Sequence, residues 1–364
     1  MNASQLAAMR LRNQQLLRSR FSTPGEVIAW MGAVQGQEYA GAKWALALRV
    51  GVPPGSKARS DGAVEQVFRA HAFIRTWAMR GTLQLINAAD ARWMVALVGP
   101  KVIAGSARRY RELELDEATL GRGCALLVEA LAGGNQLNRG QLMAILEQNG
   151  ISTTGQRSPY LLSRASLEGL ICQVDVVRNN PVYALCADIL PAGQPMQGEE
   201  ALAELAARYL ASRGPATLRD FAWWSGLPMS QCRAGWESVR SRFAQERVEG
   251  QEYWFAPELE VLMPAEPIAH LLPNYDEFLI AYADRGVSLD RAEHAHIAQG
   301  NGLSPTVEVD GRIVGTWKRA LQKARVEVAV QLFRSVVHEG LDAIRTAAEA
   351  YGTYLGLRAE CSGV

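Results

Sequence analysis

Residues Ala29-Trp-Met-Gly-Ala-Val-Gln-Gly-Gln-Glu-Tyr-Ala-Gly-Ala-Lys-Trp44 connect two predicted helices through the turn Gln35-Gly36-Gln37. The first helix is expected over residues 24–34, because a capping residue precedes Pro24 and Pro is favoured in the first turn of a helix. A second helix is expected near residues 39–49. Gly36 permits the backbone to turn between them. The stretch therefore predicts a helix-turn-helix.

The same order, two helices around a turn followed by a β-hairpin, is predicted three times. The expected helix pairs and hairpins lie at 24–34, 39–49 and 73–87 (with a short helix at 63–70), at 138–148, 158–170 and 171–185, and at 217–225, 228–243 and 248–255. Repetition strengthens an assignment that one unit alone supports only weakly. The chain is therefore predicted to hold three tandem winged helix-turn-helix motifs, a fold that presents its second helix to a DNA groove. Winged helices also serve as protein-contact modules, and that alternative stays open.

The chain becomes strand-like after Pro264. Strands are expected at 306–314, where Asp310-Gly311 is a hairpin turn signal, and at 323–333, before a helix at about 341–355. This pattern predicts an α+β protein of four units. Their expected boundaries are 1–112 (first unit), 113–192 (second unit), 200–264 (third unit) and 265–364 (C-terminal unit), with a linker at 194–200.

Composition narrows the class of protein. At 364 residues the chain is too long for one ordinary core, and 48% hydrophobic with 21% charged residues is typical of a soluble globular protein. No stretch of about 18 apolar residues predicts a membrane span, and the start lacks the apolar core of a signal peptide. The five cysteines are widely spaced without a C-x-x-C pair, which argues against disulfides or zinc and favours a reducing cytoplasm.

Charge is distributed unevenly although the net charge is only +1. Residues 1–111 hold 16 Lys and Arg against 5 Asp and Glu, and residues 112–364 hold 22 against 32. This asymmetry suggests that the N-terminal third faces an anion such as a phosphate backbone. The alternative is that the basic part docks onto the acidic part of the same chain.

The two glutamines of the opening turn have chemistry of their own. Each side-chain amide offers a carbonyl acceptor and two N–H donors and carries no charge. On an extended or turning backbone, residues two apart can converge on one point, and such a pair can hold a water molecule without ionising it. The alternative is that Gln35 and Gln37 are solvated residues at a helix end.

Several stretches together resemble one family, the winged-helix DNA-binding proteins that include the azinomycin-resistance DNA glycosylase and the YcaQ-type crosslink DNA glycosylases. They span nearly the whole chain and comprise Val34-Gln-Gly-Gln-Glu38, Arg75-Thr-Trp-Ala-Met-Arg-Gly-Thr-Leu83 with Asp90, Gly214-Pro-Ala-Thr-Leu-Arg-Asp-Phe-Ala-Trp-Trp-Ser-Gly226, Leu272-Pro-Asn-Tyr-Asp-Glu277 and Asp310-Gly-Arg-Ile-Val-Gly-Thr-Trp317.

The resemblance implies three winged helices and a small β-barrel-like C-terminal domain around a basic concave surface. It also implies a catalytic motif of Gln, an apolar residue, and Gln or Asp, which falls on Gln35 and Gln37 here. Two departures stand out. The middle residue is Gly36 rather than a bulkier one, and Gln84 stands where many relatives carry His.

The implied reaction is hydrolysis of the N-glycosidic bond of a guanine alkylated at N7 or crosslinked, in duplex DNA. Such a base already carries positive charge and leaves as a neutral molecule, so the protein has mainly to position a water. No metal or cofactor is expected, nucleases are disfavoured because no carboxylate cluster suits two metals, and the protein is expected to act as a monomer. The alternatives are a non-catalytic DNA-binding regulator and a protein-contact scaffold.

Basic residues are the candidates for phosphate contact, although each can equally be a solvated surface charge. They are Lys43, Arg75, Arg80, Arg108, Arg109 and Arg111. The carboxylates Asp276, Glu277 and Asp284, which stand near Arg285, are interpreted as members of a structural ion pair rather than as catalysts.

Overall fold

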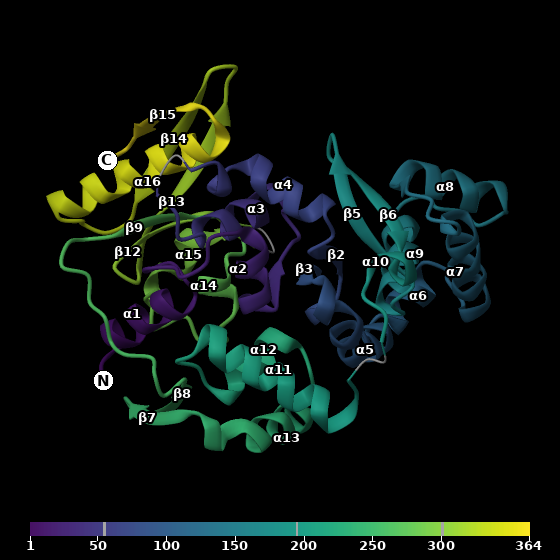
Figure 1. The fold of residues 1–364 in the computed structure, drawn as a ribbon, viewed down its shortest axis with the longest axis horizontal. Helices are drawn as coiled ribbons and strands as arrows, with labels where there is room; N and C mark the ends of the chain where they lie inside the picture. Colours follow the sequence, from purple (N-terminus) through teal and green to yellow (C-terminus); the bar gives the residue numbers. More distant parts are fainter. Residues whose placement is uncertain (54–55, 194–195, 300–301) are drawn as a thin grey trace.

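The computed structural model describes residues 1–53, 56–193, 196–299 and 302–364, and Figure 1 shows the chain as a ribbon. The first unit begins with α1 (Ala3–Asn13) and ends with two helices that follow its hairpin. In order it contains α1, α2 (Pro24–Met31), β1 (Ala33–Gln35), α3 (Tyr39–Leu48), η1 (Lys57–Arg59), α4 (Asp61–Arg69), β2 (Phe73–Trp77), η2 (Met79–Gly81), β3 (Leu83–Asn87), α5 (Ala88–Gly105) and α6 (Ala107–Glu112).

One prediction for this unit is corrected. The helix expected over 24–34 begins at Pro24, where Thr23 and Glu26 form a capping box, but it ends at Met31. Gly32 takes φ 71°, which breaks the helix, and the next three residues form the short strand β1. Gln35 therefore belongs to a strand that pairs with β3 and not to a helix end.

The helix–helix–hairpin order recurs in the second and third units. The second unit holds α7 (Glu117–Leu131), β4 (Leu137–Asn138), α8 (Arg139–Gln148), α9 (Arg157–Leu167), β5 (Ile171–Val177), β6 (Asn180–Leu185) and α10 (Cys186–Ile189). The third holds α11 (Gly198–Arg213), α12 (Leu218–Ser225), α13 (Met229–Val239), η3 (Arg240–Arg242), β7 (Ala244–Val248) and β8 (Gln251–Phe255). The linker expected at 194–200 is partly wrong, because α11 starts at Gly198; residues 194–195 lie outside the described residues.

The hairpins of the first two units merge into one sheet. Its strand order is β1-β3-β2-β5-β6-β4, and the two hairpins meet between β2 and β5 at the residue pair Arg75 and Gln173. β1 lies at one edge of this sheet, so the Gln35-Gly36-Gln37 turn follows an edge strand. The hairpin of the third unit forms a separate two-stranded sheet, β7 with β8.

The C-terminal unit is built on a five-stranded sheet of order β15-β14-β13-β12-β9, against which α16 packs (Figure 1). The strand order has two ends, β15 and β9, so within the described residues this sheet is half-barrel-like and does not close as the expected barrel would. Its elements are β9 (Ala269–Leu272), α14 (Glu277–Ile280), η4 (Arg291–Glu293), α15 (His294–Ile297), β10 (Ala298–Gln299), β11 (Gly302–Leu303), β12 (Thr306–Val309), β13 (Arg312–Leu321), β14 (Arg325–Leu332), α16 (His338–Leu355) and β15 (Arg358–Ser362).

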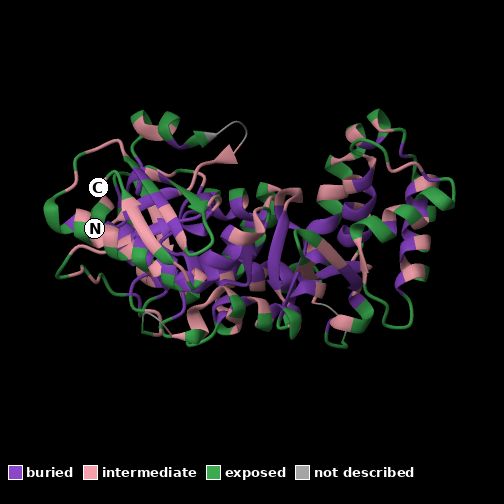
Figure 2. Cartoon of the chain, turned by 90° about the horizontal axis from the view of Figure 1, so that it is seen from above, coloured by how far each residue is buried: buried purple, intermediate pink, exposed green. Residues whose placement is uncertain are grey.

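The buried clusters cross the expected boundaries between units. The largest joins residues of α2, α3 and α4 to the sheet and helix of the C-terminal unit, and the next joins α5 to α11 and α12. Figure 2 shows the buried residues as a band through the middle of the molecule. The four-unit division stays a prediction, since adjoining units share their cores. Over the residues the structure describes, no helix combines the length and apolar composition that crossing a membrane requires.

Candidate active site

Gln35 and Gln37 lie at the exit of the edge strand β1 and differ in exposure. Gln35 is 8% exposed and Gln37 is exposed. The backbone N–H of Gln37 donates to the side-chain oxygen of Gln35 at 3.3 Å, and the N–H of Leu83 on β3 donates to the side-chain oxygen of Gln37 at 3.2 Å. A backbone N–H can only donate, so each amide must turn its oxygen toward the donor. The orientation of both amides is therefore fixed by the backbone.

Hydroxyl and amide groups complete the surroundings of Gln35. Its amide nitrogen donates to the hydroxyl oxygen of Thr82 at 3.2 Å, and that hydroxyl also accepts from Gln84 at 2.8 Å. Gln84 stands directly opposite Gln35 in the sheet, so their side chains share one face. In this chain Gln84 thus supports the hydroxyl that holds Gln35.

Gly36 fits tightly against β3. Its N–H donates to the carbonyl of Leu83 at 2.8 Å, which continues the sheet past β1. A Cβ placed at Gly36 would lie 3.1 Å from the nitrogen of Leu85 and 3.2 Å from the carbonyl carbon of Gln84. Either distance is shorter than an ordinary contact, so in this chain the glycine brings the turn close to β3.

Arg75 supports the turn from β2. Its Nε donates to the carbonyl of Gly36 at 2.8 Å, one terminal nitrogen donates to the carbonyl of Gln37 at 3.2 Å, and the other donates to the side chain of Gln173 at 2.7 Å. The residue is 7% exposed, and burial lowers the pKa of its guanidinium. Three of its N–H groups are used within the protein, two of them on the backbone of the motif, so Arg75 holds the turn in place.

A buried carboxylate holds the other side of the motif. Glu277 accepts the backbone N–H of Gln35 at 3.0 Å through one oxygen, and through the other it accepts from Arg213 at 2.9 Å and from the indole of Trp224 at 3.0 Å. Glu277 and Arg213 are both fully buried. Arg213 also donates to the carbonyls of Met31 and Ala33, which bracket the start of β1. The third and C-terminal units thus converge on the strand that carries Gln35.

A second buried ion pair lies beside the first. Arg49 at the end of α3 makes a bidentate contact with Asp276, at 2.9 and 2.7 Å, and both side chains are 1% exposed. This agrees with the interpretation of Asp276 and Glu277 as structural carboxylates. Their arginine partners are Arg49 and Arg213 and not the expected Arg285, which donates to the carbonyl of Leu279.

Two of the predicted phosphate contacts lie in buried surroundings. Lys43 is buried and pairs with Asp61 at 2.8 Å and Glu65 at 2.6 Å, so its charge is matched inside the first unit, which argues against a phosphate contact. Arg80 on η2 donates to the carbonyl of Ile280 at 3.2 Å, and burial lowers the pKa of its guanidinium. Arg80 remains partly exposed.

The other three candidates lie together on α6. Arg108 and Arg109 pair with Glu112 at 2.9 and 2.7 Å, and Arg109 also donates to Gln156. Arg108, Arg109 and Arg111 belong to a different element from the Gln turn. In the part of the chain that the structure describes, no group of three or more His, Cys, Asp or Glu side chains is placed to hold a metal ion.

Fold and site together define a class: an α+β protein of repeated helix–helix–hairpin units, with an uncharged amide turn at the edge of its main sheet. The family model described as "DNA glycosylase AlkZ-like" matches residues 28–354, and the chain belongs to this family of DNA glycosylases.

Two relatives agree with the family. An interstrand DNA cross-link repair glycosylase from Streptomyces sahachiroi is 24% identical over 335 residues, which cover 86% of this chain and 87% of the relative. The solved structure of the Streptomyces sahachiroi DNA glycosylase AlkZ matches with a TM-score of 0.79 at 20% identity and covers 100% of both chains. This structural likeness establishes the shared α+β fold.

Proposed function

We propose that this DNA glycosylase hydrolyses the N-glycosidic bond of cationic N7-alkylguanine or crosslinked guanine in duplex DNA, with Gln35 and Gln37 positioning the water. The observation that carries the proposal is that both side-chain oxygens are oriented by backbone N–H groups. A carbonyl oxygen has two lone pairs, so each keeps one after accepting that bond. The two remaining lone pairs can accept the two hydrogens of one water molecule.

The amides suit a substrate whose leaving group is already activated. Neither glutamine can ionise, so neither can remove a proton from water or supply one to the departing base. An N7-alkylated guanine carries positive charge before the bond breaks and departs neutral, so it needs no acid. The transition state is oxocarbenium-like, as in sugar hydrolysis generally, and amide oxygens favour the positive charge that develops at the sugar. The water is then held for attack by position alone, and the proton that it loses on bonding to the sugar passes to the solvent.

The DNA interface is proposed to combine three winged-helix units with exposed cations. The three helix–helix–hairpin units support this, since a winged helix offers its second helix and its hairpin to duplex DNA. Arg80, Arg108, Arg109 and Arg111 are the proposed phosphate contacts. We assign Arg75 instead to holding the motif, because of its bonds to the carbonyls of Gly36 and Gln37.

Crosslinked guanine is included because of the relative named as an interstrand DNA cross-link repair glycosylase. A bulky adduct does not readily enter a closed base pocket. A catalytic turn that follows an edge strand, with Gln37 exposed, is compatible with a lesion that stays partly outside the protein. The proposed enzyme acts as a monomer and without a metal.

The test is release of free base from defined duplexes. Wild-type protein is incubated with duplexes that carry N7-methylguanine, a guanine–guanine N7 crosslink, or unmodified guanine, and the released base is quantified by chromatography. Release from the two cationic duplexes and not from the unmodified one is expected. If the protein binds all three duplexes but releases base from none, the catalytic proposal fails and a regulator remains. If it neither binds nor cleaves them, a protein-contact scaffold remains.

A further inference from the structure

Trp223 on α12 is the one aromatic residue that the protein leaves exposed. The chain has 9 Trp, 10 Tyr and 8 Phe, all of them among the described residues, and every one except Trp223 is buried or half-buried. Trp223 is 47% exposed, whereas the adjoining Trp224 is 2% exposed. Single apolar side chains on a surface are common, so the surroundings of Trp223 decide what its exposure means.

The indole of Trp223 is held in one position beside a cation. Its Nε1–H donates to the carbonyl of Ile280 on α14 at 3.0 Å. The guanidinium of Arg80 donates to the same carbonyl at 3.2 Å, and its central carbon lies 6.0 Å from the centroid of the Trp223 ring. A ring that is already fixed loses little conformational freedom when it binds a partner, so this exposed aromatic is prepared for contact.

Arg80 is held in a strained backbone conformation. It takes φ 59°, in the left-handed region that disfavours residues with a side chain, at the hairpin tip between β2 and β3. Gly226, which follows α12, packs against it, since a Cβ there would lie 3.1 Å from the nitrogen of Arg80. Strained residues persist where their surroundings determine them, and they cluster at functional sites. The third unit therefore fixes the position of this cation.

The Trp223–Arg80 pair lies next to the Gln turn. Thr82, two residues after Arg80, accepts from the side-chain amide of Gln35 at 3.2 Å. Glu277, in the first turn of α14, accepts the backbone N–H of Gln35 at 3.0 Å. The hairpin tip and α14 thus each contact both the exposed pair and the proposed catalytic turn.

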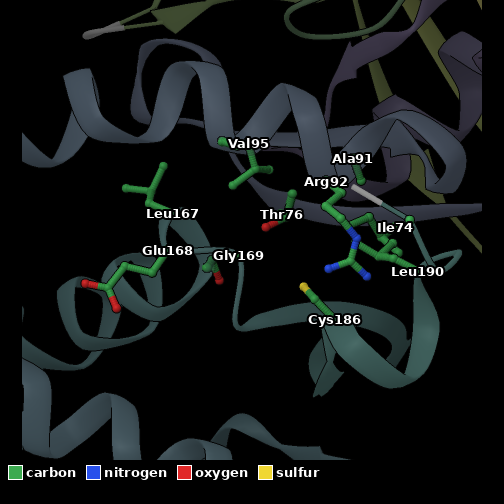
Figure 3. A pocket seen from close by; sticks show the side chains of 13 residues that line it. Ile74, Thr76, Ala91, Arg92, Val95, Leu167, Glu168, Gly169, Cys186 and Leu190 are labelled. Carbon is green, nitrogen blue, oxygen red and sulfur yellow. The ribbon is translucent and has the colours of Figure 1, made fainter. Parts of the chain in front are cut away.

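Arg80 also lines a groove of about 490 Å³ whose walls come from β2, η2, α5 and α9 and from Gly226. Arg80 and Lys101 are the charged residues that line it, and no carboxylate of the described residues does. Four other cavities each include a Glu or Asp in their walls, among them the cavity of Figure 3, where Glu168 accompanies Arg92. The groove beside Trp223 therefore suits an anion.

We propose that Trp223 and Arg80 form one nucleotide contact beside the reaction centre: the indole stacks on a DNA base next to the lesion, and the guanidinium binds the adjoining phosphate. Every base has a π-face, and a basic groove that follows the backbone commonly accompanies such stacking. In a duplex the indole reaches the face of a base only where the stack has opened, so the complex holds a partly unstacked base beside the lesion.

This contact rests on the proposed function, because it takes damaged DNA as the partner. A nucleic acid is favoured over a protein since the aromatic ring, the cation and the groove without carboxylates adjoin the turn that is proposed to face the lesion.

The emission of 2-aminopurine, a base whose fluorescence depends on stacking, tests the contact on wild-type protein. The duplexes carry N7-methylguanine on a 2′-fluoro sugar, whose fluorine disfavours the oxocarbenium-like transition state and so slows base release. Two of them have 2-aminopurine on either side of the lesion, and a third has it half a helical turn away. A change of emission on binding is expected from an adjacent probe and not from the distant one. Equal responses from all three probes, or none from either adjacent probe, would overturn the proposal.

Trp223→Ala and Trp223→Phe separate stacking from packing. Alanine removes the ring, so it is expected to weaken binding of the lesion duplex about tenfold or more and to abolish the emission change. Phenylalanine keeps a π-face but loses the N–H that bonds to Ile280, and it is expected to retain most of both signals. If both variants lose them equally, the indole only holds the fold and the contact is refuted. Val337→Ala, at an apolar residue that is 66% exposed before α16, is expected to bind as wild type does.

Salt dependence separates the two halves of the contact. Arg80→Gln is expected to reduce the slope of log affinity against log salt by about one, while Trp223→Ala, which removes no charge, is expected to leave the slope unchanged. Far-UV circular dichroism checks that each variant folds, and the comparison of probe positions stands on wild-type protein alone.

These readouts follow binding, so their failure differs from failure of the catalytic proposal. An emission change beside the lesion, without base release from ordinary N7-methylguanine, would refute catalysis and support the contact. Base release by a Trp223→Ala variant that binds as wild type does would refute the contact and leave Trp223 as a surface for a protein partner.

Discussion

Gln35 and Gln37 show how much the immediate surroundings of a residue decide its chemistry. Gln35 is buried and uses its oxygen, its amide nitrogen and its backbone N–H in hydrogen bonds within the protein. Gln37 is exposed, and its oxygen accepts from Leu83. The pair therefore combines an amide fixed inside the fold with an amide that faces solvent.

The rate of base release is predicted to be nearly independent of pH. Neither amide titrates, so the proposed catalytic motif contributes no pKa between about pH 5.5 and 8.5, where a catalytic His would reveal itself. Single-turnover release of N7-methylguanine measured across this range checks the point. A bell-shaped or sigmoid profile of the chemical step would show that an ionisable group takes part.

The variant Glu277→Gln is predicted to lower the free energy of unfolding by about 3–5 kcal/mol, because it leaves the guanidinium of Arg213 buried without a counter-charge. Glu237→Gln is the matched control: Glu237 pairs with Arg240 on the surface, where both side chains are about half exposed, and an effect below about 1 kcal/mol is expected. Urea denaturation measures both. Equal effects of the two changes would mean that the buried pair does not hold β1.

At the scale of single residues, the sequence singles out Gln35 and Gln37 but not the residues that hold them in place. Gln35 and Gln37 are found from a family pattern. Glu277 is visible as one of two adjacent carboxylates, yet nothing in the sequence indicates that its partners are Arg213, 64 residues earlier, and the N–H of Gln35, 242 residues earlier. Contacts of such separation come from packing between units, which local patterns do not encode.

At the scale of elements, α5 and α9 pack in close contact at Gly99. A Cβ added there would overlap the backbone carbonyl oxygen of Leu167 at the end of α9. This contact joins the first unit to the second.

The variant Gly99→Ala is predicted to destabilise the protein by about 1–3 kcal/mol, since the helices must move apart to admit the methyl group. Gly105→Ala, in the last turn of the same helix, meets nothing within 4 Å and is expected to stabilise by roughly 0.5–1 kcal/mol through helix propensity. Thermal unfolding of both variants compares them. A neutral Gly99→Ala would show that the α5–α9 contact is looser than described.

Elements with local start signals are predicted well, and elements without them are missed. α2 and α12 begin at capping boxes, and the sequence predicts them near their true starts. The sequence patterns do not predict α5, α6 or α7, and they assign the start of α11 to a linker. α5 and α11 bury residues on several sides, so their sequences lack a clean polar face. The three-residue β1 was missed because it exists only through pairing with β3.

At the scale of the whole molecule, part of the excess positive charge of residues 1–111 is paired with carboxylates inside the protein. Arg10 pairs with Asp220 at 3.9 Å, and Arg49 pairs with Asp276 at 2.7 Å. These pairs support the alternative that the basic N-terminal third docks onto the acidic remainder. On α6, Arg108 and Arg111 are exposed and Arg109 is partly exposed, so this helix carries the cations of the proposed DNA contact.

DNA affinity is predicted to fall steeply with salt, and Arg111→Gln is predicted to reduce the slope of log affinity against log salt by about one. Arg345→Gln on α16 removes the same charge from the C-terminal unit and is expected to leave the slope unchanged. Fluorescence anisotropy with a duplex at several salt concentrations gives both slopes. Identical slopes for the two variants would remove α6 from the DNA interface.

The central claim is that Gln35 and Gln37 position the water that attacks a cationic lesion. Its most direct test is the single-turnover rate of base release from an N7-methylguanine duplex with excess protein. Gln35→Ala and Gln37→Ala are each predicted to slow this rate by about 10²-fold or more, because a water held loosely loses its alignment. Gln66→Ala, at an exposed glutamine of α4 in the same unit, is predicted to react at the wild-type rate. Folded variants at Gln35 and Gln37 that also react at the wild-type rate would contradict the account.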